Sequence, residues 1–230
     1  GKAGKLPLVL FLPGSRVSEL KHHVPVMLKT AGAIGADWPS VRFRMVLPNE
    51  RLARLALEIV ATASRRLQIE PGPDLPAHFT ADLGRFGLRT IELRHGQLVE
   101  AMHEATVAIA STGTVTMECA YFGMPTVAIY RALWSNYQIG KRVILVNFLA
   151  MPNILAGQAI YPEFVQHEAT PQNIAREALD LLENPERRDS MRGKLLEVIA
   201  SLGSPGAGQR AARAIWDLFL TRNPLVLPRP

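Results

Sequence analysis

Residues 6–16 read LPLVLFLPGSR, and this stretch decides the fold class. Its apolar part, residues 6–12, is short and continuous, as is typical of a strand buried on both faces of a sheet. Pro13 and Gly14 then force a sharp turn. Over 17–34 the apolar residues recur at helical spacing, which predicts a helix. A buried strand that turns sharply into a helix is typical of parallel α/β sheets.

The same alternation continues along most of the chain. The sequence predicts strands over 41–47, 89–93, 106–110 and 125–130, and helices over 50–67 (capped by Asn49), 96–104, 115–122 and 135–146. A turn at Pro152-Asn153 precedes three helical runs between 171 and 220. Residues 70–87 are rich in Pro and Gly and lack periodicity, which indicates a loop or insertion. We therefore predict a Rossmann-like α/β fold: an open parallel sheet with helices on both faces, followed by C-terminal helices.

Length and composition narrow the class of protein. The 230 residues suffice for a domain over 1–222, with a Pro-rich tail over 223–230 expected to be disordered. No apolar run approaches the roughly 20 residues that span a bilayer. The single cysteine, Cys119, lies in an apolar stretch and is interpreted as a buried small side chain, which fits a reducing cytoplasm.

The net charge of +6 indicates an anionic partner. A nucleic acid, a phospholipid surface and a nucleotide diphosphate all fit that charge. The sequence has no basic cluster interleaved with aromatic residues and no Cys/His finger spacing, so we expect no nucleic acid. No carboxylate cluster has metal-ligand spacing, and we expect neither a metal nor a cofactor.

Two strand ends carry residues suited to phosphate binding, because ligands of open α/β sheets lie outside the carboxyl ends of the strands. Ser15 and Arg16 follow the first strand, where helix N–H groups and a guanidinium attract anions. An equally weighted alternative is a capped helix, with Ser15 as the cap and Glu19 in the first turns.

The second strand end is the turn Ser111-Thr112-Gly113-Thr114, which offers free N–H donors to a diphosphate. Glu118 lies about one helical turn further on, at a distance that suits the hydroxyls of a ribose. Taken in isolation, a hydroxyl-capped helix with a surface Glu is the better interpretation of this stretch.

Two further segments are less specific. Arg131 lies just past the strand over 125–130, where it faces either the ligand or solvent. Asn153 and Gln166 carry amides that suit sugar hydroxyls or a base edge. Their alternative roles are a turn-forming residue for Asn153 and a surface side chain for Gln166.

Taken together and in order, these segments resemble lipid-A-disaccharide synthase. The motifs are LPGSRxxE, TGTxxxE, GxPxVxxYR, PNxLAG and PExxQ, at residues 12–19, 112–118, 123–131, 152–157 and 162–166. The match extends from about 6 to 220, and the segment 152–157 is its most specific part. The resemblance implies the C-terminal half of a two-domain, GT-B-type glycosyltransferase with its active site between two Rossmann-like domains.

The implied reaction is an inverting, metal-independent transfer. It joins the glucosamine of UDP-2,3-diacylglucosamine to an acylated glucosamine 1-phosphate and releases UDP. The family's N-terminal half carries the acceptor site and the general base and is absent from the matched stretch. We therefore expect this chain to bind the donor without completing the transfer.

The resemblance also assigns roles to individual residues. Ser15 and Arg16 are expected near the donor phosphates, with backbone donors from 112–114, and Glu118 is expected to hold the ribose. The expected donor cleft also contains a further set of side chains: Asn153, Gln166, Arg131 and Glu163. Arg16 and Asn153 are the expected catalytic groups, Arg16 because charge builds on the leaving phosphate.

Other interpretations stay open. A UDP-N-acetylglucosamine 2-epimerase or a peptidoglycan glucosaminyltransferase has the same architecture, and a non-catalytic UDP-binding module is a third hypothesis. A dehydrogenase is disfavoured, since no GxGxxG follows the first strand. We expect a cytoplasmic protein and keep open a homodimer and a peripheral contact with the inner membrane. Residues 134–148 could touch lipid, although a helix packed on its own sheet is the better interpretation.

Overall fold

The computed structural model describes residues 6–64, 67–70, 78–82, 88–131, 147–203 and 206–222. The chain divides into two compact units, residues 1–198 and 199–230. The domain expected over 1–222 extends across both units. The predicted helix over 135–146 and the tail over 223–230 lie outside the described residues.

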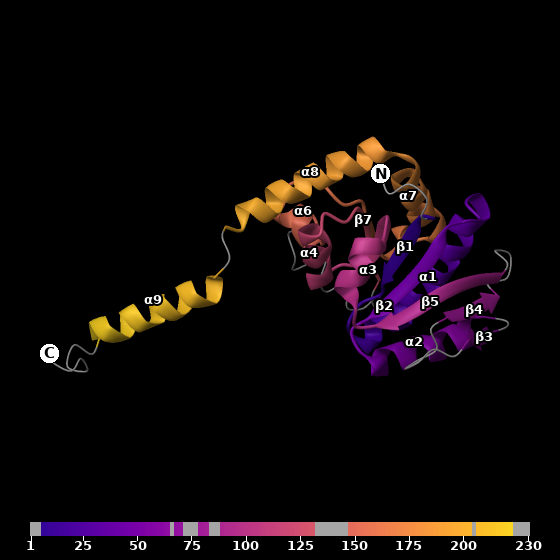
Figure 1. The fold of residues 1–230 in the computed structure, drawn as a ribbon, viewed down its shortest axis with the longest axis horizontal. Coiled ribbons are helices and arrows are strands. Elements are labelled where there is room, and N and C mark those ends of the chain that lie inside the picture. Colours follow the sequence, from indigo (N-terminus) through magenta and orange to yellow (C-terminus); the bar gives the residue numbers. More distant parts are fainter. Residues whose placement is uncertain are drawn as a thin grey trace. The chain divides into compact units, whose positions relative to one another are not determined.

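The first unit is built on one eight-stranded sheet with the order β3-β4-β5-β2-β1-β6-β7-β8 (Figure 1). Its strands are β1 (Leu8–Leu12), β2 (Arg42–Leu47), β3 (Leu67–Glu70), β4 (His78–Asp82), β5 (Leu88–His95), β6 (Val107–Ser111), β7 (Thr126–Tyr130) and β8 (Glu163–Val165). All neighbouring pairs from β5 to β8 are parallel. This is the predicted Rossmann-like sheet, with an antiparallel edge added.

β1 lies in the middle of the sheet, between β2 and β6. Each of its residues is buried, and Val9, Leu10 and Phe11 are fully inaccessible. Consecutive side chains of a strand point to opposite faces, so their complete burial requires covering layers on both faces, which explains the continuous apolar run in the sequence.

Seven helices accompany this sheet among the described residues of the first unit. They are α1 (Val17–Asp37), α2 (Glu50–Ala63), α3 (Leu98–Glu104), α4 (Thr114–Tyr121), α6 (Met151–Ala156), α7 (Pro171–Glu183) and α8 (Pro185–Ser201), with a 3-10 turn, η2 (Gln166–Glu168). α1 packs against both α2 and α7, while α3 contacts β1 and β2 and α4 contacts β6 and β7.

The antiparallel edge differs from the sequence prediction. The sequence predicts a loop or insertion over 70–87, and a plain loop is wrong in part, because β4 lies within this stretch and pairs with β3 and β5. Within residues 79–82 of β4, Phe79 and Ala81 are buried, 1% and 0% exposed. So short an alternation of buried and less buried residues cannot be recognised in the sequence among Pro and Gly. The helix expected to reach residue 67 ends at Ala63.

Two other elements were misjudged. Pro152 and Asn153 lie within α6 rather than in a turn, with Pro in the first helical turn, where its missing N–H costs nothing. β8 was not predicted, because its three residues are only half-buried. No helix among the described residues has the length and apolarity needed to cross a membrane.

The second unit contains α9 (Ala207–Arg222), the last of the three predicted helical runs. Within it, the rings of Trp216 and Phe219 stack with centroids 5.8 Å apart.

Candidate functional site

A cavity of about 560 Å³ opens where β1, β2, β5 and β6 end. Its walls come from four consecutive strand-to-helix junctions and α6: Leu12, Gly14, Ser15, Arg16, Glu19, Val46, Leu47, Pro48, Gly96, Gln97, Leu98, Ser111, Thr112, Gly113, Thr114, Val115, Glu118 and Met151. The chain passes from β1 to β2 on one side and later returns to β6 on the other, so strand order reverses between β1 and β6. Such reversal points are where open α/β sheets bind ligands.

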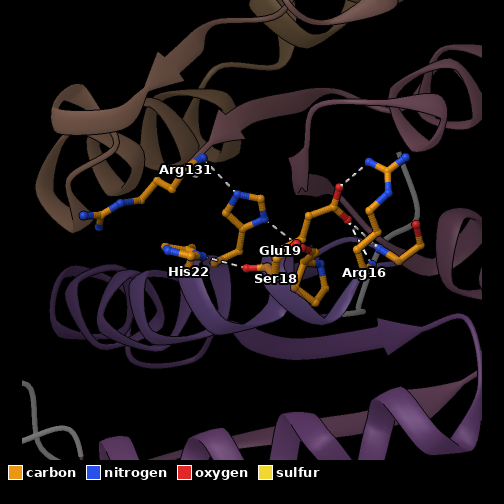
Figure 2. Close-up of polar contacts among 8 residues, drawn as sticks. Arg16, Ser18, Glu19, His22 and Arg131 are labelled. Carbon is orange, nitrogen blue, oxygen red and sulfur yellow. Dashed lines mark hydrogen bonds and ion pairs between the residues drawn. The ribbon is translucent and has the colours of Figure 1, made fainter. Parts of the chain in front are cut away.

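The turn after β1 is organised by Glu19. Its carboxylate accepts hydrogen bonds from the backbone N–H groups of Ser15 (2.8 Å) and Arg16 (3.1 Å), and it pairs with the Arg16 guanidinium (3.1 Å; Figure 2). The alternative of a capped helix is therefore confirmed, although the cap is formed by Arg16 and Glu19, and Ser15 as the cap was wrong. The backbone N–H groups of the turn that leads into α1 are therefore already bound by a negative charge of the chain itself.

The turn after β6 differs from the turn after β1, because no carboxylate of the described residues caps the helix that follows it. Gly113 takes a φ of +139° as the N-cap residue of α4, and no described side chain caps the helix. The Thr116 hydroxyl donates to the Gly113 carbonyl (2.6 Å), which points that carbonyl into the helix. A helix start without a side-chain acceptor leaves N–H groups for another partner. In this structure the cavity lies at that position.

Glu118 lies one turn along α4 and is exposed to the same cavity. The cavity therefore contains the expected phosphate-binding and ribose-binding residues from both strand ends: Ser15, Arg16, Thr112, Gly113, Thr114 and Glu118.

Sequence reasoning missed the wall formed by β2 and β5. Gly96 and Gln97 both adopt left-handed backbone angles (φ 62° and 53°), and the Gly96 N–H donates to the Leu47 carbonyl (2.9 Å). With Pro48 and Leu98 they form a largely apolar part of the cavity. The signal was present in the sequence, because Gly96 begins the predicted helix that follows the predicted strand over 89–93, and such a junction lies at the same edge as the other strand ends.

Asn153 does not line the cavity, and its side chain is fully buried. Its amide nitrogen donates to the Tyr161 carbonyl (2.8 Å) and to Glu163 (2.7 Å), and its amide oxygen accepts from Ile160 N–H (2.9 Å) and Tyr161 N–H (2.8 Å). These bonds use the whole side-chain amide and support the alternative in which Asn153 fixes local backbone.

Glu163 continues this network. Its carboxylate accepts from the N–H groups of Leu149 (2.8 Å) and Ala150 (3.0 Å), immediately before α6. The first residue of α6, Met151, lines the cavity. Asn153 and Glu163 thus act on the cavity through the backbone that leads into α6.

Arg131 and Gln166 also lie outside the lining residues. The backbone N–H of Arg131 donates to the ring of His23 (3.0 Å), while its side chain points away from Arg16 and Glu19 (Figure 2). Gln166 begins η2 after β8 with a φ of 52°.

Cys119 is completely buried, and burial raises the pKa of its thiol to about 12. A thiol of that pKa is not a nucleophile near neutral pH, which agrees with its interpretation as a small core residue. Within the described ranges, no group of three His, Cys, Asp or Glu side chains is arranged to hold a metal ion.

The sheet order and the cavity define a Rossmann-like α/β domain. Solved structures of the spinosyn rhamnosyltransferase SpnG have this fold: one bound to spinosyn aglycone has a TM-score of 0.54 and 13% identity, covering 91% of this chain and 46% of that chain. Another SpnG structure, complexed with thymidine diphosphate, has a TM-score of 0.50 and 12% identity, covering 86% and 42%.

Sequence comparison identifies the family. The profile of the lipid-A-disaccharide synthetase family matches residues 80–207. Lipid-A-disaccharide synthase of Solibacter usitatus is 33% identical over 94% of this chain and 50% of its own length; that of Anaeromyxobacter dehalogenans is 34% identical over 90% and 48%. The chain belongs to the lipid-A-disaccharide synthase family. It spans about half the length of the curated relatives that it matches.

Proposed function

We propose that this chain is the donor-binding half of a glycosyltransferase that moves 2,3-diacylglucosamine from UDP to 2,3-diacylglucosamine 1-phosphate. The observation that carries the proposal is that the β6–α4 turn, Glu118 and the Arg16 corner line one cavity, at the reversal point of the sheet. Family membership supplies the substrate class.

The diphosphate belongs at the start of α4 rather than at the start of α1. The Glu19 carboxylate already occupies the backbone N–H groups of the turn before α1, those of Ser15 and Arg16, and it places a negative charge there, whereas no described side chain caps α4. Arg16 is mostly exposed, with 79% of its side chain accessible, so its guanidinium can turn from Glu19 toward a phosphate. In that position it would stabilise the negative charge of departing UDP.

The positions of the ribose and the uracil follow from this position of the diphosphate. Glu118, one turn along α4, would accept hydrogen bonds from the ribose hydroxyls. The apolar wall of Leu47, Pro48 and Leu98 would pack on the uracil ring, beside the left-handed turn at Gly96-Gln97.

We assign the remaining residues to the sugar side of the site. Asn153 and Glu163 hold the backbone before α6, and Arg131 and Gln166 are proposed to border the donor cleft. The acceptor site and the general base would belong to the family's other half. Because both substrates are acylated, we propose that the enzyme works in the cytoplasm at the surface of the inner membrane.

Titration calorimetry with UDP tests this proposal on the 230-residue chain. Glu118→Ala should weaken binding roughly tenfold or more, the cost of losing charge-assisted hydrogen bonds. The matched control is Glu197→Ala, an exposed carboxylate on α8, which should bind as the unsubstituted chain does. A folded chain that ignores UDP at millimolar concentration would disprove the assignment.

A further inference from the structure

His23, on α1, connects two loops that are far apart in sequence. The side chain is 1% exposed. Its Nδ1 lies 2.8 Å from the carbonyl oxygen of Pro13, and its Nε2 lies 3.0 Å from the backbone nitrogen of Arg131. A backbone N–H can only donate, so Nε2 must be the unprotonated nitrogen. Nδ1 therefore carries the hydrogen and donates it to Pro13, and the ring is neutral.

The two loops lie on either side of the β6–α4 turn. In the sheet, β6 separates β1 from β7, so Pro13 and Arg131 follow the strands that flank it. The turn itself is tied to β7, because the Thr112 N–H donates to the Ile129 carbonyl (3.0 Å). His23 completes this arrangement by tying the end of β7 to the loop that carries Gly14, Ser15 and Arg16.

We propose that His23 is a positioning residue of the donor site: its neutral imidazole holds the β1–α1 turn at a fixed place beside the β6–α4 turn and releases it when the ring is protonated. This inference rests on the proposed function, because the site that it positions is the proposed UDP site. His23 itself does not line the cavity.

The surroundings of the ring favour its neutral form. Burial lowers the pKa of His23, and the charges of His22 and Arg131 lower it further, while the bond to Pro13 and the carboxylate of Glu19 act in the opposite direction. These are the described groups that act on the ring from α1 and from the end of β7. A proton on Nε2 would face the N–H of Arg131, so that two donors would oppose each other and the bond would be lost.

The pH dependence of UDP binding tests this role. We would titrate UDP into the unsubstituted chain, His23→Leu, His23→Gln and a control, His22→Gln, from about pH 8 down to about pH 5, a range that extends well below the ordinary histidine pKa because the pKa of His23 is lowered. Leu removes both hydrogen bonds. Gln can still donate to Pro13 and accept from Arg131, but it does not titrate.

At the alkaline end, His23→Leu should bind UDP roughly five- to tenfold more weakly, and His23→Gln within about twofold of the unsubstituted chain. On acidification, the unsubstituted chain and His22→Gln should lose more affinity than His23→Gln. Titration of UDP itself affects all four proteins alike, so it cancels in the comparison. An imidazole ¹⁵N spectrum should also show the Nδ1–H tautomer.

Two results would overturn the inference alone: undiminished binding by His23→Leu, or an acid loss in His23→Gln equal to that of the unsubstituted chain. If His23→Leu does not fold, the comparison with His23→Gln decides. Failure of the folded, unsubstituted chain to bind UDP would instead overturn the proposed function, and this inference with it.

Discussion

Glu19 occupies the place at the start of α1 where the sequence suggested a bound anion. Its carboxylate satisfies the N–H groups of Ser15 and Arg16, and it approaches Gly14 so closely that a Cβ there would lie 2.3 Å from the carboxylate oxygen. Gly14 also has a φ of +117°, which other residues adopt only with strain. Residue 14 must therefore be Gly for the cap to form, and the negative charge of Glu19 at this turn supports our proposal that the diphosphate binds at α4.

Gly14→Ala should accordingly destabilise the chain, by about 2 kcal/mol, through backbone strain and displacement of Glu19. Urea unfolding followed by circular dichroism measures the loss. The control is Gly193→Ala in α8, where an added Cβ meets no atom within 4 Å. That substitution should be neutral or stabilise the chain by up to about 1 kcal/mol. Equal stability of the two variants would contradict our account of the turn.

At the scale of elements, the site is formed by the turns that join the ends of four strands to the following helices. The junctions after β1, β2, β5 and β6 meet at one cavity because their strands are parallel neighbours. α6 reaches the same cavity with its first residue, Met151. It is held there by the buried amide of Asn153 and the carboxylate of Glu163.

We therefore expect Asn153→Ala to lower the free energy of unfolding, and to affect ligand binding only through that loss of stability. It leaves the N–H groups of Ile160 and Tyr161 and one carbonyl without their partner, which should cost about 2–4 kcal/mol. Thermal unfolding measures the effect. The control, Asn173→Ala, removes a single exposed bond to the Glu168 carbonyl and should cost no more than about 0.5 kcal/mol. An Asn153→Ala protein as stable as the control would contradict the structural role of this amide.

At the scale of the whole molecule, one buried titratable ring links stability to pH. The pKa of His23 is lowered from its ordinary value of 6.5, chiefly by burial. The unfolded chain therefore binds a proton more readily than the folded chain. The neutral ring contributes its full stability above pH 6.5, and that contribution falls as the pH drops from there toward the folded pKa.

We expect the free energy of unfolding to decline on acidification more steeply in the unsubstituted chain than in His23→Gln. Urea midpoints measured at several pH values, with His22→Gln as the control, would reveal the difference. Parallel curves for the unsubstituted chain and His23→Gln would show that the ring is not held neutral by the fold.

The sequence by itself determined the parallel core of the sheet, because buried strands and amphipathic helices leave periodic apolar patterns. It also indicated the residues at the ends of β1 and β6, since turn chemistry is local. Only the tertiary structure decided that the Glu19 carboxylate binds the backbone of the turn before α1, that Asn153 is a buried structural amide, and that His23 joins Pro13 to Arg131. Each of these depends on which groups meet in space, and hydrogen-bond partners brought together by folding leave no periodic pattern along the chain.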